Sequence, residues 1–196
     1  MSELVIDGHR IGVLFSEAEI AARVKAIAEA IAARKPANLL VVPILKGSFV
    51  FAADLIRAMH HAGLSPEVDF MILSSYRKST KSSGQVTVLR DIETDVRGRD
   101  VLLIDDILES GRTLAFAKDL LAARGARGTY TAVLLNKPGH LAAHIGADFE
   151  GFTCPDKFVV GYGMDMGHQF RELPFVGHVI RAEAPSSGEA KAKEQA

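Results

Sequence analysis

The chain has 196 residues and a mass of 21.1 kDa, which fits one compact domain that folds without a disulfide or a structural metal. Its 23 Lys and Arg against 24 Asp and Glu leave a formal net charge of −1, so there is no electrostatic case for general binding to nucleic acid. Hydrophobic residues make up 48% and charged residues 24%, values that exclude a disordered chain.

Targeting signals and cysteine usage predict a cytoplasmic protein. Residues 1–10 have neither the basic segment nor the apolar segment of a signal peptide. The longest apolar stretch, residues 39–45, contains Pro43 and is far too short to span a membrane. The single Cys154 cannot form an internal disulfide, which fits a reducing compartment, and we expect it to be buried and inert.

Strand-like and helix-like segments alternate along the chain. Ser16 and Glu19 have the spacing of a capping box, and the apolar pattern after them predicts a helix that ends at Arg34. Strands are predicted at residues 38–45, 68–75, 86–92, 101–105 and 130–136. Helices are predicted at residues 48–61 and 113–124, and a polar loop at residues 77–85. This alternation predicts an α/β fold with a mainly parallel sheet.

The pattern changes after residue 148. Short strand-like stretches rich in Gly and aromatic residues follow, and we expect them to form a hood or an edge of the sheet. Residues 183–196 have no large apolar side chains, so they are predicted to be a disordered tail. The expected organisation is a single domain over residues 1–182 followed by that tail.

The most informative segment is a buried strand that ends in Asp105 and Asp106 and leads through a short loop into a helix. Ligands of an α/β sheet bind at the carboxyl ends of its strands, and N–H groups at a helix N-terminus bind phosphate. Gly111 lets the backbone approach a phosphate closely, while Ser110 and Thr113 add hydroxyl donors. Adjacent carboxylates suit a diol, or a metal bound to that diol. The segment therefore predicts a site for a ribose 5-phosphate.

A plainer interpretation is that Asp105 and Asp106 only cap the turn after the strand. The complete string argues against it, because the chain contains neither of the glycine-rich patterns that would explain phosphate binding in another way, G-x-x-x-x-G-K-[ST] and G-x-G-x-x-G. The seven histidines show no H-E-x-x-H or comparable spacing, so no zinc site is expected.

The segment resembles the 5-phosphoribosyl-1-pyrophosphate (PRPP) signature of the type I phosphoribosyltransferases. Three further motifs resemble the hypoxanthine (hypoxanthine-guanine) branch of that family: residues 45–48 (LKGS), 74–76 (SSY) and 155–165 (PDKFVVGYGMD). The resemblance runs from about residue 5 to about residue 181. It implies the family's fold, in which helices flank a mainly parallel sheet, the N- and C-terminal segments form a small hood, and a mobile lid loop covers residues 76–86.

The resemblance implies roles for the PRPP signature. Asp105 and Asp106 would hold the ribose hydroxyls, directly or through Mg²⁺, and the 5-phosphate would be wrapped by Ser110, Gly111, Arg112 and Thr113. Glu109 occupies the position of the general base near N7 of the purine, where the family usually has aspartate, and Ser110 stands where threonine is common. Pyrophosphate would be bound by Lys46, Gly47 and Arg171, with a non-proline cis peptide often found at the lysine.

The same resemblance implies the purine-binding residues. Lys137 would donate to the 6-oxo group, Phe158 would stack on the base, and the Val159 backbone would contact its edge. Asp165 would lie at this part of the site and hold a second Mg²⁺, and Met166 follows it where relatives often have an aromatic residue. Without the resemblance, Lys137 is better interpreted as a solvated strand end, Phe158 as a core residue and Asp165 as a turn residue.

Ser75 and Tyr76 would open the lid that closes over the reacting centre, and the polar residues 77–85 would form its body. Composition alone fits two interpretations equally well. One is a flexible lid that excludes water from the reaction, and the other is an ordinary solvated hairpin loop.

These roles predict purine salvage by Mg²⁺-dependent transfer of the phosphoribosyl group from PRPP to N9 of hypoxanthine or guanine, giving IMP or GMP and pyrophosphate. One alternative is an enzyme of the same fold that prefers xanthine or guanine. Another is a gene regulator on this fold that senses PRPP or nucleotide, which should carry a basic face or an added DNA-binding segment. We expect small-molecule substrates, no nucleic-acid or membrane partner, and a homodimer or homotetramer.

Overall fold

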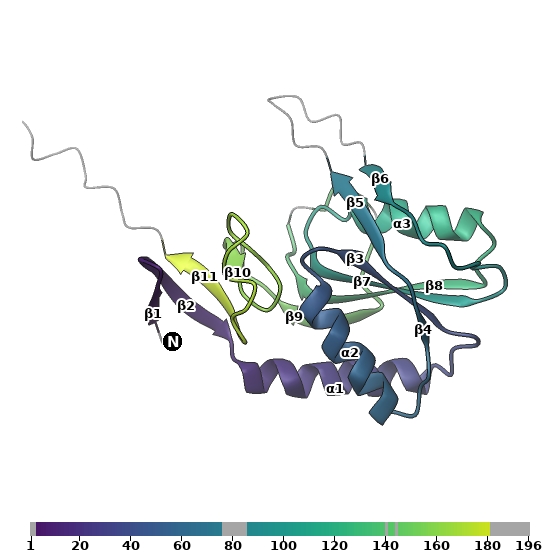
Figure 1. Cartoon of the computed structure of the whole chain (residues 1–196), viewed down its shortest axis with the longest axis horizontal. Helices are drawn as coiled ribbons and strands as arrows, with labels where there is room; N and C mark the ends of the chain where they lie inside the picture. Colours follow the sequence, from purple (N-terminus) through teal and green to yellow (C-terminus); the bar gives the residue numbers. More distant parts are fainter. Residues whose placement is uncertain (1–2, 76–85, 140, 144, 181–196) are drawn as a thin grey trace, which may run out of the picture.

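The structure is a computed structural model that describes residues 3–75, 86–139, 141–143 and 145–180. The predicted lid, apart from Ser75 and Val86 at its ends, and the predicted tail lie outside the described residues. The described residues form two β-sheets, and the first helix leads from one sheet to the other (Figure 1).

The larger sheet confirms the mainly parallel arrangement that the sequence predicts. Its strands lie side by side in the order β6 (Val86–Arg90), β5 (Met71–Ser75), β3 (Leu40–Leu45), β7 (Asp100–Leu108), β8 (Gly128–Asn136) and β9 (Phe149–Thr153), with the short β4 (Glu67–Val68) also paired to β3. All neighbouring pairs are parallel except β5 with β6. The carboxyl ends of β3 and β7 therefore lie at the same edge of the sheet.

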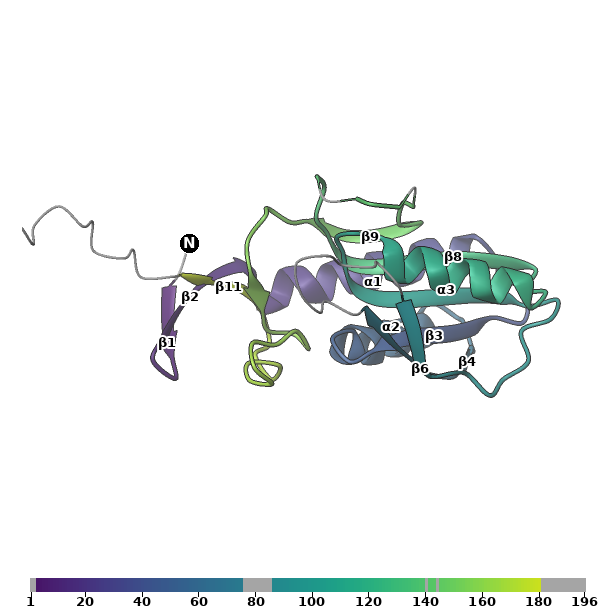
Figure 2. The ribbon, with the colours of Figure 1, turned by 90° about the horizontal axis from the view of Figure 1, so that it is seen from above.

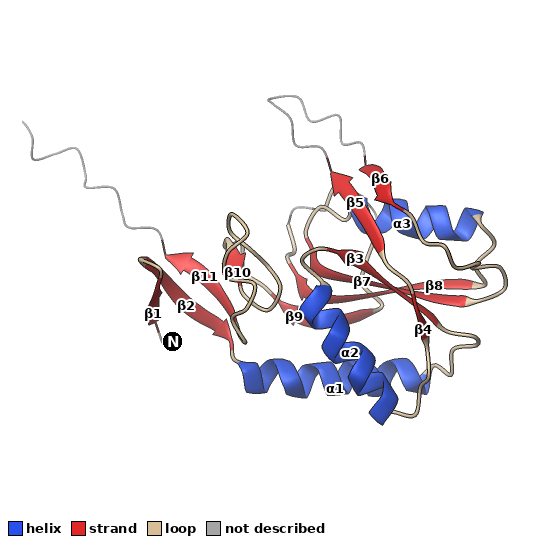
Figure 3. Ribbon diagram, in the orientation of Figure 1, coloured by secondary structure: helices blue, strands red, loops and turns tan. Residues whose placement is uncertain are grey.

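Helices cover both faces of this sheet (Figure 3). Helices α1 (Glu17–Ala33) and α2 (Phe49–His61) pack on one face with Leu102 and Ile104 of β7, and α3 (Arg112–Ala123) packs on the other face with Val101 and Leu103. Alternate residues of a strand point to opposite faces, so a strand covered on both sides is apolar throughout. No helix among the described residues is both long enough and apolar enough to cross a membrane.

The capping box predicted at the start of α1 is confirmed. The Ser16 hydroxyl accepts from the backbone N–H of Glu19, and the Glu19 carboxylate accepts from the backbone N–H of Ser16 at 2.8 Å. The two bonds satisfy N–H groups that a helix start otherwise leaves without partners. They fix the point at which the chain leaves the smaller sheet and enters the helix.

The smaller sheet, which we call the hood sheet, joins segments from both ends of the chain. Its antiparallel order is β1 (Glu3–Ile6), β2 (His9–Phe15), β11 (Val176–Ile180) and β10 (Val159–Val160). Residues 161–175, the hood loop, connect β10 to β11. Seen from above, the hood sheet lies beyond one end of the larger sheet (Figure 2).

Two strands differ most from their predicted extents, while β3, β6 and β8 each differ by two residues at one end. The strand expected over residues 68–75 is interrupted, because the Asp69 carboxylate accepts backbone N–H groups of Phe70, Glu93 and Thr94 at 2.7 to 2.9 Å and bends the chain between β4 and β5. Strand β7 continues past its predicted end to Leu108, paired with β8 throughout. Asp105 and Asp106 therefore lie within the last part of the strand rather than at its end.

Candidate active site

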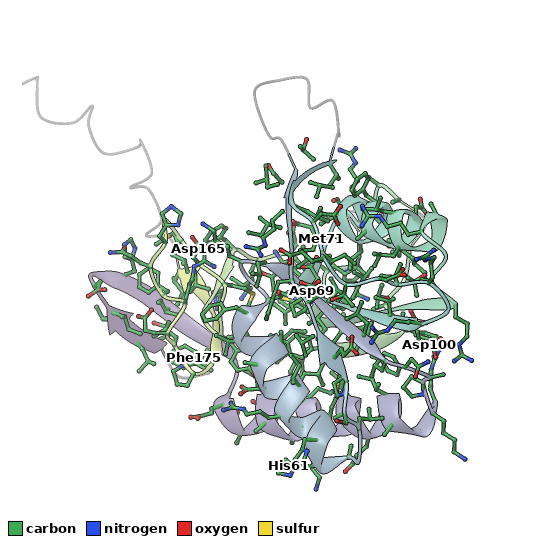
Figure 4. The ribbon with its side chains drawn as sticks, turned by 45° about the vertical axis from the view of Figure 1, so that its right-hand side comes forward. His61, Asp69, Met71, Asp100, Asp165 and Phe175 are labelled. Carbon is green, nitrogen blue, oxygen red and sulfur yellow. The ribbon has the colours of Figure 1, made fainter. Side chains whose placement is uncertain are left out.

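A cleft of about 270 Å³ lies at the carboxyl ends of β3 and β7. Most of the residues predicted to bind the ribose, its 5-phosphate and pyrophosphate meet here together with the predicted base Glu109, since the lining includes Lys46, Gly47, Asp105, Asp106, Glu109, Ser110, Gly111 and Thr113. In Figure 4, Asp100 at the start of β7 and Asp165 of the hood loop lie on opposite sides of the view. The strand thus runs toward the hood and ends at the cleft. Two predicted residues do not line the cleft: Arg112 of the phosphate set is exposed at the start of α3, and Arg171 of the pyrophosphate set lies in the hood loop.

Asp105 and Asp106 are half-buried neighbours in one strand, and their like negative charges repel each other. Burial, followed by the negative charge of Asp106, raises the pKa of Asp105 well above its usual range. Burial also raises the pKa of Asp106, although hydrogen bonds with Asp105 and the Ile107 N–H and the charge of Arg171 lower it. A carboxylate pair in this state gains from a cation or from hydroxyl donors placed between the two groups.

The phosphate loop is the short connection from β7 to α3. Gly111 has a φ of +73°, the left-handed region that favours glycine, and an added Cβ would lie 2.5 Å from Cγ2 of Ile145. Gly111 is also the N-cap of α3 and has no side-chain oxygen to accept from the first-turn N–H groups. The helix start therefore offers those donors, and its positive dipole end, to an anion.

The predicted pyrophosphate loop follows β3. The Leu45–Lys46 peptide bond is cis, as the resemblance implies. A Cβ on Gly47 would lie 1.8 Å from Oδ2 of Asp106, and a Cβ on Gly163 of the hood loop would lie 2.3 Å from the Gly47 carbonyl oxygen. The loop, the acidic strand end and the hood loop are thus packed against one another at positions where only glycine fits.

The residues predicted to contact the purine lie between β8 and the hood sheet. Lys137 follows β8 and is only 7% exposed; its Nζ donates to the backbone carbonyl of Lys157 at 2.7 Å and lies 3.9 Å from Oε1 of Glu109. The interpretation of Lys137 as a solvated strand end is therefore wrong. Phe158 is 51% exposed, so its interpretation as a core residue is wrong too, while Val159 is buried in β10. The Lys137 ammonium is thus bonded to the backbone of the residue that precedes the exposed Phe158, and a buried donor together with an exposed ring suits a flat heterocycle.

The hood loop holds the last two predicted residues. The Asp165 carboxylate accepts from the backbone N–H of His168 at 2.8 Å, as in an ordinary turn, and it also forms an ion pair with Arg171 at 2.6 Å. Arg171 donates to the Gly163 carbonyl at 2.6 Å, and its charge reaches Asp106. Asp165 does not line the cleft with Asp105 and Asp106, so a second metal there stays a prediction.

Three residues near this site had no predicted role, although two of them, Lys157 and Tyr162, lie in the motif at residues 155–165. The hydroxyl of Tyr162 in the hood loop donates to Asp54 of α2 at 2.6 Å, and burial together with this bond raises the pKa of the phenol. Lys157 and His178 contact each other at 3.2 Å between Nζ and Nε2. Because the partners are separated by 108 and 21 residues, local patterns do not reveal these contacts.

Comparison with known proteins identifies the family. The model of the phosphoribosyl transferase domain family matches residues 14–166. The hypoxanthine phosphoribosyltransferase of Escherichia coli K12 is 39% identical over 175 residues, which cover 88% of this chain and 97% of the relative. The chain belongs to the phosphoribosyltransferase family. The hypoxanthine-guanine phosphoribosyltransferase of Bacillus subtilis 168 is 45% identical over 166 residues, covering 84% of this chain and 91% of the relative.

Solved structures of phosphoribosyltransferases share the fold. The crystal structure of a hypoxanthine phosphoribosyltransferase from Staphylococcus aureus matches with a TM-score of 0.80 and 36% identity, covering 86% of this chain and 91% of that chain. A structure described as a glutamic acid mutant, from an analysis of an invariant aspartic acid in HPRTs, matches with a TM-score of 0.80 and 35% identity, covering 87% and 95%. This phosphoribosyltransferase is therefore a glycosyltransferase enzyme of purine salvage with the type I fold.

Proposed function

We propose that the enzyme transfers the 5-phosphoribosyl group of PRPP to N9 of hypoxanthine or guanine and releases pyrophosphate, giving IMP or GMP. The observation that carries this proposal is the buried ammonium of Lys137, 3.9 Å from the Glu109 carboxylate that borders the cleft. An ammonium has donors only, so it suits the oxygen of a 6-oxopurine, and a carboxylate suits the removal of a proton from the ring.

The reaction exchanges one bond at C1 of the ribose for another. The C1–O bond to pyrophosphate breaks with its electron pair on the leaving oxygen, and the purine N9 forms the new bond to C1 through an oxocarbenium-like transition state. The N7 proton of the purine passes to the Glu109 carboxylate. The N–H groups at the start of α3 and the hydroxyls of Ser110 and Thr113 hold the 5-phosphate, while Lys46 and Arg171 hold the pyrophosphate.

The residues at the cleft fit Mg²⁺. Among the described residues no group of three or more His, Cys, Asp or Glu side chains could hold a metal ion by itself. Mg²⁺ is commonly bound by one or two carboxylates, with water and substrate oxygens as its other ligands, and Asp105 and Asp106 provide such a pair in the lining of the cleft, where the absence of a side chain at Gly47 lets the Asp106 carboxylate come close. When bound, the ion would neutralise charge on the pyrophosphate leaving group.

Self-association is part of this proposal. The resemblance implies a homodimer or homotetramer, and one similar solved structure, that of Trypanosoma cruzi hypoxanthine phosphoribosyl transferase, is described in terms of the role of its C-terminal region in oligomeric state and activity. Sedimentation at several protein concentrations tests this; a monomer at all of them would contradict it.

Nucleotide formation tests the proposed activity directly. The protein is mixed with PRPP, Mg²⁺ and, separately, hypoxanthine, guanine, xanthine or adenine, and the product is followed by chromatography. We expect IMP and GMP, with loss of activity in EDTA and recovery on addition of Mg²⁺. Turnover of xanthine and guanine without hypoxanthine would support the xanthine- or guanine-preferring alternative, and PRPP binding without any product would support the regulator.

A further inference from the structure

Consecutive polar contacts connect Lys137, the buried lysine proposed to bind the purine, to the hood sheet. Lys137 Nζ donates to the backbone carbonyl of Lys157 at 2.7 Å, and Lys157 Nζ lies 3.2 Å from Nε2 of His178. Nδ1 of His178 in turn lies 3.0 Å from the backbone carbonyl oxygen of Gly12. The contacts therefore extend from β2, at the start of the chain, to the end of β8.

The partners fix how the His178 ring is protonated. A carbonyl oxygen only accepts, so Nδ1 must carry the proton that it shares with Gly12. In the neutral ring Nε2 is then an acceptor, and the Lys157 ammonium donates to it. Each nitrogen of the ring has one suitable partner, and the side chain of Lys157 is held in one direction.

The backbone around these residues is also fixed. His178 is paired with Gly12 of β2 on one side and with Val159 of β10 on the other. The N–H of Val179 donates to the Phe158 carbonyl at 3.1 Å, so residues 157–159 lie along β11. An added Cβ on Gly12 would be 2.5 Å from Cε1 of His178, which shows that the ring lies directly over this glycine.

We propose that His178 and Lys157 are positioning residues that hold Lys137 in place for purine binding. This inference rests on the proposed role of Lys137. The Lys137 ammonium has three N–H donors; the Lys157 carbonyl accepts one, and the others remain for Glu109 and the purine 6-oxo oxygen. The side-chain contact between Lys157 and His178 keeps that carbonyl, and the neighbouring Phe158, at a fixed distance from β8.

Two substitutions of His178 separate its two contacts. His178→Asn keeps an amide donor near the position of Nδ1 but has no group that reaches Lys157, whereas His178→Gln places an amide oxygen near the position of Nε2. Removing one hydrogen bond of this kind costs about 0.5–1.5 kcal/mol, which corresponds to about 2- to 13-fold in an equilibrium constant. We therefore expect the KM for hypoxanthine to rise by that factor in His178→Asn and to stay close to wild type in His178→Gln.

Two further substitutions change the two partners of the His178 ring, Lys157 and Gly12. Lys157→Met keeps the backbone carbonyl and the aliphatic stem but removes the ammonium, and Gly12→Ala pushes the His178 ring aside. Both should raise the KM for hypoxanthine and leave the KM for PRPP unchanged. The matched control His60→Asn, at the exposed end of α2, should change neither.

A spectroscopic measurement does not depend on activity. Long-range ¹H–¹⁵N correlation spectra of the full chain should show His178 as the Nδ1–H tautomer, with the Nε2 signal shifted in Lys157→Met. An Nε2–H tautomer, equal KM changes for both substrates, or a fall in melting temperature with neither KM changed would overturn the inference. If the wild type instead forms no nucleotide while the tautomer is as expected, then the proposed function fails and the contacts stand.

Discussion

Glu109 is one of the residues at which this chain departs from the pattern it resembles, and its side chain is longer than the usual aspartate by one methylene. The longer side chain brings its carboxylate to 3.9 Å from the Lys137 ammonium, so the group proposed to accept the proton and the group proposed to bind the base already form an ion pair. With glutamate in place of aspartate, the chain therefore still has a carboxylate next to Lys137, the residue proposed to bind the purine.

If Glu109 accepts the N7 proton, Glu109→Gln should lower kcat by about 10²–10⁴, the usual contribution of a positioned general base. A base acts only when deprotonated, so the wild-type rate should fall as the pH is lowered, and this fall should disappear in the variant. The pH dependence of kcat measures both effects. Glu109→Asp, the matched control, should keep the acidic fall; its persistence in Glu109→Gln would mean that another group takes the proton.

The acidic pair should make the ligand-free enzyme less stable as the pH rises. Because the pKa of Asp105 is raised in the folded state, folding favours its protonated form, and the resulting stability is complete below about pH 4 and lost as the pH rises through the higher folded pKa. Asp105→Asn should therefore raise the free energy of unfolding at pH 7 by about 0.5–2 kcal/mol. Thermal melts from pH 4 to 8 test this, and a pH-independent difference between the proteins would contradict it.

Asp95 provides a control of opposite sign for that experiment. Hydrogen bonds from Arg97 lower the pKa of this exposed carboxyl to about 2, so its ionised form is favoured by folding. Asp95→Asn should lower the melting temperature at neutral pH and have less effect as the pH falls toward 2, whereas it should leave kcat unchanged.

Lys137 should determine which purines react. Its ammonium cannot accept from the 6-amino group of adenine, which would leave both groups without partners, and sites of this kind discriminate by about 10⁴–10⁵. Lys137→Ala should raise the KM for hypoxanthine and guanine much more than the KM for PRPP. Steady-state kinetics with each substrate varied provide the measurement, with Lys118→Ala in the middle of α3 as control. Efficient use of adenine by the wild type would contradict this assignment.

At the scale of elements, local patterns predicted most of the fold. The capping box at Ser16 and the apolar periodicity located α1 and α2 to within one residue at each end, because helix caps and core contacts are set by neighbouring residues. The interruption at Asp69 was missed, because its partners Glu93 and Thr94 are distant in sequence. The extension of β7 was missed for a related reason: its last residues are held by pairing with β8.

The site residues also fall into a group that local sequence predicts and a group that it does not. The side chains of the phosphate loop are consecutive in sequence, so one strand–loop–helix segment places them together. The purine side is assembled from β8, the hood loop and the hood sheet, so the burial of Lys137 and the contacts of Tyr162 and His178 required the structure. Residue types alone pointed to the opposite conclusion for Lys137.

The bond between Tyr162 and Asp54 connects the hood loop to α2, and Tyr162→Phe removes only that bond. We expect a loss of about 0.5–1.5 kcal/mol in the free energy of unfolding and a raised KM for PRPP, because Arg171 lies in the same loop and bonds to Gly163 next to Tyr162. Denaturant melts and kinetics measure the two effects. Tyr130→Phe, near the start of β8, is the control; a raised KM for hypoxanthine alone would show that the bond supports the purine side instead.

For the whole molecule, the pairing of β2 with β11 sets an order in which the enzyme becomes complete. Gly12 and His178 are 166 residues apart, and contacts between such distant segments form late because closing a long loop costs entropy. On the ribosome, β3, β7 and α3, which carry the predicted pyrophosphate and phosphate loops, emerge well before β11. The hood sheet is complete only when β11 has been made. A growing chain therefore contains the loop between β7 and α3, proposed to bind the ribose 5-phosphate, before it contains Arg171 and His178, so the proposed contact with pyrophosphate and the proposed positioning of Lys137 are completed last.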